Sequence, residues 1–189
     1  MTSFTELVRG GSTAEEIAAH LDGLSAAQRV EEVLALPGGL QEKLWKIVEG
    51  QRVELDQIVD VEGETLIYEL KNSLPLFNIS QKRFFKPAEG EVVGYNHTTG
   101  LAKTFAGPGY FFVQDGKDGL EFDYTRLPTL QPEGWPEIKP NTGLIPGATY
   151  GNMIDYCRRL SKHSLIGEAW KKGKPMGAYF MLTRCVAQS

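Results

Sequence analysis

The sequence lacks the short motifs that identify common active sites. It contains no G-x-G-x-x-G loop, no G-x-x-x-x-G-K-S/T loop and no G-x-S-x-G turn, so dinucleotide, phosphate-cradling and serine-hydrolase sites of the usual pattern are excluded. The two cysteines, Cys157 and Cys185, allow at most one disulfide and form no metal-binding pattern. The histidines (His20, His97 and His163) are scattered. We therefore expect no metal and no cofactor, and no catalytic residue can be named from a motif.

Long apolar runs are also lacking. No stretch approaches the length of a membrane-spanning helix, and the first residues carry neither the basic nor the apolar segment of a secretory signal. We expect a cytoplasmic protein with free thiols and no membrane span.

The composition is that of an ordinary globular protein, with 41% hydrophobic and 23% charged residues in a chain of 189. This length favours one domain, with a small helical appendage possible. The net charge of −4 is uneven, because residues 1–64 carry −8, residues 65–150 carry −1 and residues 151–189 carry +5. A basic end can contact nucleic acid, but no nucleic-acid-binding motif accompanies it. A solvated basic face is the simpler interpretation, and we expect no nucleic-acid partner.

Three short amphipathic helices are predicted in the first fifty residues. Ser12-Thr13-Ala14-Glu15-Glu16 is a good helix start with a small hydroxyl at the cap, Ser25 caps the second helix, and Pro37–Gly39 ends it. The third helix carries its apolar stripe between Leu40 and Val48. We expect residues 1–50 to form a helical cap on a β domain of residues 51–189. The acidic helices could instead bind a protein partner, as an adaptor would.

The stretch Gly90–Tyr124 is predicted to be an antiparallel meander. Leu120, Phe122 and Tyr124 alternate with polar residues, which is the period of a strand with one buried face. Tyr110–Val113 is a continuous apolar run, as in a strand buried on both faces. Asp-Gly pairs favour a hairpin between Val113 and Leu120. The expected strands are 92–97, 101–105, 110–113 and 120–124.

Other strands are predicted on both sides of this meander. Val53–Tyr68 indicates two strands with a turn at residues 61–64, and Leu74–Ile79 an edge strand or a loop. Gln81–Lys86 interleaves cations with aromatic residues; this could serve an anionic ligand, but is more typical of a strand with its cations outward. Asn152–Ser161 fits a helix or a strand equally. Residues 164–170 and 178–186 predict a hairpin around a basic turn.

Residues 127–147 contain five prolines, which exclude both a helix and a central strand. A long ordered loop of this kind is often a lid or a binding loop. We expect Trp135 and Ile138 to pin it to the body of the protein.

Two kinds of site remain open. Asp155, Tyr156, Arg158 and His163 are the densest ionisable cluster and could act as acid and base groups, if they converge in space. The aromatic residues favour a curled sheet with a cavity for one small ligand, although a packed core would also use them. The expected ligand-binding residues are Tyr95, Tyr110, Phe112, Tyr124, Trp135, Tyr156 and Arg158.

The order of several short motifs resembles that of lipocalin-like (calycin) barrel proteins. These motifs are Gly94-Tyr95-Asn96, Gly109-Tyr110-Phe111, Asp155-Tyr156-Cys157-Arg158, Leu165-Ile166-Gly167 and Tyr179-Phe180-Met181-Leu182. The G-x-W signature of lipocalins is absent, and the N-terminal helices are additional. The resemblance implies an up-and-down barrel that binds an apolar small molecule inside, with Tyr and Arg side chains fixing a polar end, and it implies no catalytic residues.

The sequence thus predicts an α+β fold in which short N-terminal helices pack on a strongly bent antiparallel sheet or a lipocalin-like β-barrel. The leading functional hypothesis is a non-catalytic binding protein for a small, largely apolar ligand. The alternatives are a small-molecule enzyme and a protein-interaction adaptor.

Overall fold

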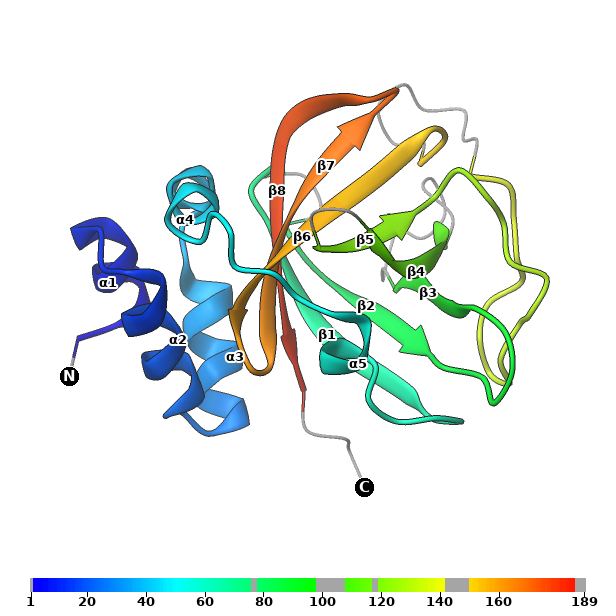
Figure 1. The fold of residues 1–189 in the computed structure, drawn as a ribbon, viewed down its shortest axis with the longest axis horizontal. Coiled ribbons are helices and arrows are strands. Elements are labelled where there is room, and N and C mark those ends of the chain that lie inside the picture. Colours follow the sequence, from blue (N-terminus) through cyan, green and yellow to red (C-terminus); the bar gives the residue numbers. More distant parts are fainter. Residues whose placement is uncertain (1, 76–77, 98–107, 117–118, 142–149, 186–189) are drawn as a thin grey trace.

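The computed structural model describes residues 2–75, 78–97, 108–116, 119–141 and 150–185. Eight antiparallel strands follow one another around a closed barrel, in which the last strand pairs with the first (Figure 1). The predicted α+β architecture with a β-barrel is confirmed. The strands are β1 (Thr65–Asn72), β2 (Ile79–Phe85), β3 (Val92–His97), β4 (Tyr110–Gly116), β5 (Gly119–Asp123), β6 (Met153–Ser161), β7 (Ser164–Lys171) and β8 (Lys174–Arg184).

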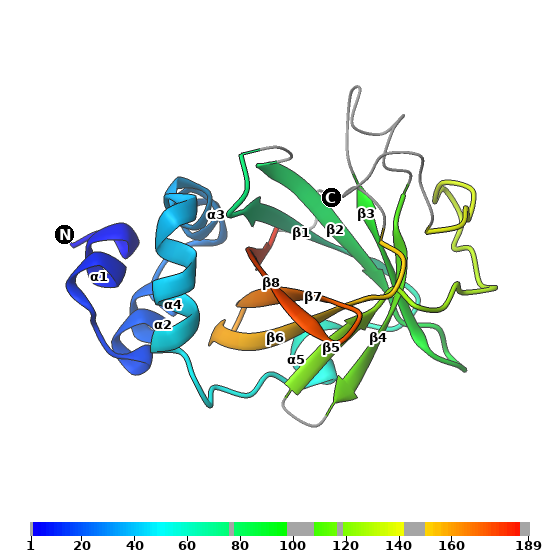
Figure 2. The same ribbon diagram turned by 90° about the horizontal axis from the view of Figure 1, so that it is seen from above.

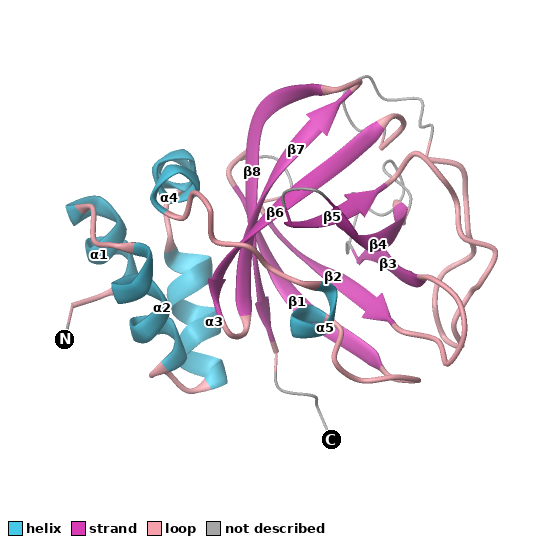
Figure 3. Ribbon diagram, viewed as in Figure 1, coloured by secondary structure: helices cyan, strands magenta, loops and turns pink. Residues whose placement is uncertain are grey.

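Short helices lie together on one side of the barrel (Figures 1 and 3). They are α1 (Phe4–Gly10), α2 (Ala14–Asp22), α3 (Ala26–Ala35), the 3₁₀ turn η1 (Gly38–Leu40) and α4 (Gln41–Ile47). Capping boxes begin α1, α2 and α3 at Ser3, Thr13 and Ser25, where a side-chain oxygen accepts from an otherwise unpaired backbone N–H. The helix α1 is additional to the three that the sequence predicted.

The helical layer covers the outer wall of the barrel at β6, β7, β8 and β1 (Figure 2). Apolar residues of the helices, including Ile17, Val33 and Leu44, share a buried cluster with Ile166 and Met181 from the strands. Helices and barrel therefore have a common core on this side.

A short helix, α5 (Leu55–Ile58), closes one end of the barrel. The sequence predicted a strand here, and that prediction is wrong. The Leu55 N–H donates to the Asp115 carboxylate (2.8 Å), and the Tyr68 hydroxyl donates to the Ile58 carbonyl (2.8 Å). Because these partners come from distant strands, tertiary contacts stabilise a helix that local alternation did not predict.

The ambiguous segment Asn152–Ser161 contains a strand, β6, which pairs with β5 and β7. The predicted hairpin that follows is confirmed as β7 and β8, joined by a turn at Lys172 and Gly173 with positive φ. The strand expected at 101–105 lies outside the described residues.

Aromatic rings pack across the interior of the barrel. Tyr68, Phe84, Phe111, Phe122 and Phe180 contact one another with ring centroids 5.1 to 6.2 Å apart. Two glycines make room for them: a Cβ at Gly94 would lie 2.4 Å from the Phe111 ring, and one at Gly167 would lie 2.2 Å from the Phe180 ring. Packing of the rings across the interior thus depends on glycines, which have no side chain, at these two positions of the wall.

The proline-rich segment is an ordered loop over residues 127–141, as predicted, and this part lies on the outer wall. Trp135 packs against Tyr95 with ring centroids 4.6 Å apart, and its indole N–H donates to Thr65 (3.0 Å). Ile138 packs on the same cluster, so the prediction that these two residues pin the loop is confirmed. Residues 142–147 lie outside the described residues.

Candidate functional site

Four polar side chains meet inside the barrel towards the end opposite α5. Lys82 of β2 lies directly across from Asn96 of β3, Tyr124 follows β5, and Asp155 lies near the start of β6. All four are buried. Closure of the barrel brings Lys82 and Asp155 together although 73 positions separate them in the chain.

Lys82 is the centre of this group. Its ammonium donates to the Asn96 side-chain oxygen (2.8 Å), to the Tyr124 hydroxyl, and to Oδ2 of Asp155 at a longer 3.4 Å. Both side chains of the ion pair are only 3% exposed. The rings of Phe111, Phe122, Tyr124 and Phe180 surround the Lys82 nitrogen at 4.8 to 5.3 Å from their centroids. This cation points inward, so the prediction that the cations of Gln81–Lys86 face outward is wrong for Lys82.

Burial and mutual attraction oppose each other in this pair. Burial lowers the pKa of Lys82 and outweighs the raising effect of Asp155. Burial also raises the pKa of Asp155, against the lowering effect of Lys82. The pKa of Tyr124 lies well above its ordinary value because of burial and the Asp155 carboxylate. Desolvation of the two charges therefore costs much of what their attraction gains.

Asn96 and Tyr124 complete the network. The Asn96 amide donates to the Gly109 carbonyl (3.1 Å) and to the Tyr124 hydroxyl (3.2 Å), which in turn donates to Oδ2 of Asp155 (3.3 Å). The Tyr150 ring stacks on Tyr124 with centroids 5.1 Å apart. It also lies against Gly109, where a Cβ would come within 2.3 Å. The tyrosine that orients Asp155 is therefore itself held by packing.

Oδ1 of Asp155 is buried and has no hydrogen-bond partner among the described residues. An unsatisfied buried acceptor costs about 1–3 kcal/mol, and more when it is charged. The arrangement therefore offers a ligand one strong acceptor within an otherwise satisfied network.

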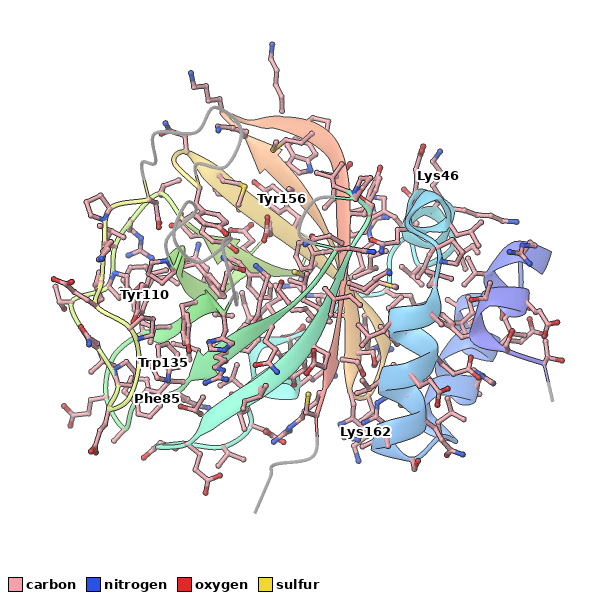
Figure 4. The ribbon with its side chains drawn as sticks, turned by 180° about the vertical axis from the view of Figure 1, so that it is seen from behind. Lys46, Phe85, Tyr110, Trp135, Tyr156 and Lys162 are labelled. Atoms are coloured by element: carbon pink, nitrogen blue, oxygen red, sulfur yellow. The ribbon has the colours of Figure 1, made fainter. Side chains whose placement is uncertain are left out.

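The sequence-predicted ligand residues lie in different places. Four of them form one cluster on the outer wall, beside the proline-rich loop, where Figure 4 shows Phe85, Tyr110 and Trp135 on the same side. Tyr124 lies inside the barrel. Tyr156 lies apart from the outer-wall cluster, near the Trp170 ring at 5.3 Å between centroids. The outer-wall cluster of predicted residues is Tyr95, Tyr110, Phe112 and Trp135.

Arg158 binds the helical layer rather than the interior. Its guanidinium lies 3.8 Å from the Trp45 ring centroid and donates to the Trp45 carbonyl (2.6 Å). Because residues alternate along β6, Arg158 and Tyr156 point away from the face that Asp155 occupies. His163 lies in the turn between β6 and β7. The convergence that an acid/base site of these four residues requires is not met.

Lys82 and Asn96 were missing from the sequence-based site. The sequence did contain one indication that Lys82 points inward: Lys82 and Phe84 are two positions apart, so they share one face of the strand. Among the described residues, no group of three or more His, Cys, Asp or Glu side chains could hold a metal ion.

A cavity of about 440 Å³ lies away from this network, between α2, α5 and the β6–β7 turn. Its lining includes Asp22, Asp60 and Lys162. Asp60 already pairs with Arg184 (2.8 Å), and Asp22 accepts the Lys162 backbone N–H (3.0 Å). These carboxylates stabilise the junction between helices and barrel.

Comparison with known proteins finds no match to a family model, to a curated protein or to a solved structure. The helices in the described ranges include none that is both long and apolar enough to cross a membrane. The chain is therefore defined by its own geometry: a closed eight-stranded antiparallel barrel with a helical layer and a buried Lys–Asp network.

Proposed function

We propose that this protein binds a small, largely apolar ligand inside the barrel, with a hydrogen-bond donor of the ligand directed at Asp155. The observation that carries the proposal is the buried, unpartnered Oδ1 of Asp155 within an aromatic interior. An apolar residue at this position would avoid the cost of a buried acceptor without a partner.

The arrangement of the interior supports a ligand at one end only. The segment around α5 occupies the other end, where Ile58 and Val59 belong to the buried cluster of the interior. Towards the polar network the interior is lined by Phe111, Tyr124, Tyr150 and Met153. The apolar body of a ligand would contact these side chains, and its polar group would meet Asp155. We propose that the ligand enters from the end opposite α5.

The charge of the network limits the ligand chemistry. The Lys82 ammonium and the Asp155 carboxylate already neutralise each other, so a neutral donor such as a hydroxyl group fits better than a second cation. Of the seven residues predicted from the sequence, we propose Tyr124 as a direct contact. The outer-wall cluster and the Arg158–Trp45 contact would stabilise the wall and the helical layer. The division into a helical cap, 1–50, and a β domain, 51–189, stays a prediction.

The proposal is tested by equilibrium binding of an environment-sensitive fluorescent fatty alcohol and of its methyl ether, which lacks the donor. A hydrogen bond to a charged group contributes about 1.5–3 kcal/mol, so the alcohol should bind at least about tenfold more tightly. Native mass spectrometry of freshly purified protein should show any ligand that is retained.

A matched pair of variants locates the binding. Ala169 lies directly across from Asp155 in the β6–β7 register and shares its face, so Ala169→Trp should fill the site and abolish binding. Ala27→Trp, on the exposed face of α3, should leave binding unchanged. Absence of saturable binding by either probe, with no retained ligand, would refute the proposal.

A further inference from the structure

Lys82 has features of a reactive amine. Exposed lysines are protonated at neutral pH and poor nucleophiles, whereas a desolvated lysine loses its proton more readily. Lys82 is buried among four aromatic rings and contacts one carboxylate. One proton transfer from its nitrogen to Asp155 gives a neutral amine and a neutral acid with no change in net charge.

The contacts of the Lys82 nitrogen are unequal in length. The bond to Asn96 is short at 2.8 Å, whereas the contact with Asp155 is 3.4 Å, which is longer than a typical N–H···O bond. Oδ1 belongs to the same carboxylate and has no partner. A ligand atom held at Oδ1 would therefore lie next to the carboxylate that makes the longest of the three polar contacts of the amine.

We infer that Lys82 captures the carbonyl group of an aldehyde or ketone ligand as an imine, with Asp155 as the proton carrier and counter-ion. This inference rests on the proposed function, because the apolar body of the carbonyl ligand would occupy the same end of the barrel.

The atoms and charges of the step balance. Asp155 takes one proton from the ammonium, and the amine lone pair forms the C–N bond while the carbonyl π electrons move to oxygen. That oxygen takes the proton from Asp155, and the resulting hydroxyl group can donate to Oδ1. The nitrogen of this adduct then gives a second proton to Asp155, Asp155 passes that proton to the hydroxyl group, and water leaves as the nitrogen lone pair forms the C=N bond. The product is a protonated imine beside the Asp155 carboxylate, so the buried pair keeps its charges, and the aromatic rings still face a cation.

The test is reductive trapping in the full-length protein. Folded protein at pH 7 is incubated with octanal and sodium cyanoborohydride, and modified lysines are located by peptide mapping and mass spectrometry. Burial lowers the pKa of Lys82 and so raises the neutral fraction of its amine, so Lys82 should be modified more than any exposed lysine. Unreactive 1-octanol should compete and reduce the modification.

Two variants complete the design. The double variant K82M/D155N removes the amine without leaving a lone buried charge, and it should lose the selective adduct. Lys71 is also largely buried, at 9% exposed, but alternates with the inward-facing Leu70 on β1, so K71M should keep the adduct. Circular dichroism of each variant is the check that it is folded.

The outcomes separate this inference from the proposed function. Selective modification of Lys82 that octanol suppresses supports both. Saturable binding of the fluorescent alcohol, with Lys82 modified no more than exposed lysines, overturns the imine and leaves the binding function standing. Absence of both binding and adduct overturns both.

Discussion

The substitution Lys82→Met measures how strongly the buried pair is coupled to folding. Methionine has a similar length, but it leaves the Asp155 carboxylate buried at 3% exposed without its cation. Two unit charges 3.4 Å apart attract by about 5 kcal/mol at an effective dielectric constant near 20. Breaking a buried pair by removing one partner typically costs about 3–5 kcal/mol. We therefore expect the free energy of unfolding to fall by about 3–5 kcal/mol at pH 8.

The pH dependence gives this prediction a second signature. In the folded protein burial raises the pKa of Asp155 above its unfolded value, and removal of Lys82 removes the main opposing effect. A raised folded pKa means a stability contribution that is present below the unfolded pKa and is lost as pH rises through the folded pKa. The destabilisation of Lys82→Met should therefore be smaller at pH 5 than at pH 8.

Urea denaturation followed by tryptophan fluorescence provides the assay, with Lys46→Met as the control. Lys46 and Glu42 form a shorter ion pair, 2.7 Å, but their side chains are 71% and 59% exposed, and Figure 4 shows Lys46 on the outside of α4. Such a pair contributes about 0.5 kcal/mol or less. The double variant K82M/D155N should be less destabilised at pH 8 than Lys82→Met alone. A loss for Lys82→Met no larger than that of the control, or independent of pH, would refute the reasoning.

Three further predictions concern the barrel wall. Gly167→Ala should destabilise by about 1–3 kcal/mol, because its Cβ would lie 2.2 Å from the Phe180 ring, whereas Gly39→Ala meets no atom within 4 Å; a shared urea midpoint would contradict this. Trp135→Ala should cost about 3–5 kcal/mol and speed proteolysis within residues 127–141, while Trp170→Ala should leave that cleavage unchanged. Burial alone would raise the pKa of Asp123, but hydrogen bonds from Thr125 and Arg126 outweigh it, and the pKa is lowered. The ionised Asp123 carboxylate therefore contributes stability above its unfolded pKa, and this contribution is lost as pH falls through the folded pKa. Asp123→Asn should weaken the dependence of the free energy of unfolding on pH below about pH 4.

The spacing of apolar residues in the sequence predicted the strands whose residues themselves carry the burial pattern. The apolar run Tyr110–Val113 is buried on both faces. The alternating residues Leu120, Phe122 and Tyr124 all point into the barrel interior, as their spacing predicted. The helix α1 was missed although Ser3 begins a capping box of the same form as Thr13, so the signal was present. By contrast, α5 depends on Asp115 and Tyr68. No pattern within residues 53–61 contains those partners.

The candidate site was less predictable for a related reason. Alternation along β2 says that Lys82 shares a face with Phe84, but a cation on a strand is placed outward by default because an unpaired buried charge is costly. The partner that offsets this cost, Asp155, comes from a strand on another part of the closed barrel. Likewise Tyr156 and Arg158, which are neighbours of Asp155 in sequence, lie on the opposite face and contact Trp170 and Trp45.

The buried network is also more than the fold requires. Replacing a buried ion pair by apolar residues of similar volume is often neutral or stabilising, and the buried cluster inside the barrel otherwise consists of apolar side chains, most of them aliphatic or aromatic. A chain that needed only a core could place leucine at both Lys82 and Asp155. Instead it keeps a pair whose pKa values burial shifts towards the neutral forms, and one carboxylate oxygen that nothing in the described residues satisfies. We propose that a ligand that donates to that oxygen offsets the second of these costs, and this makes the interior of the barrel a better candidate site than the aromatic cluster on its outer wall.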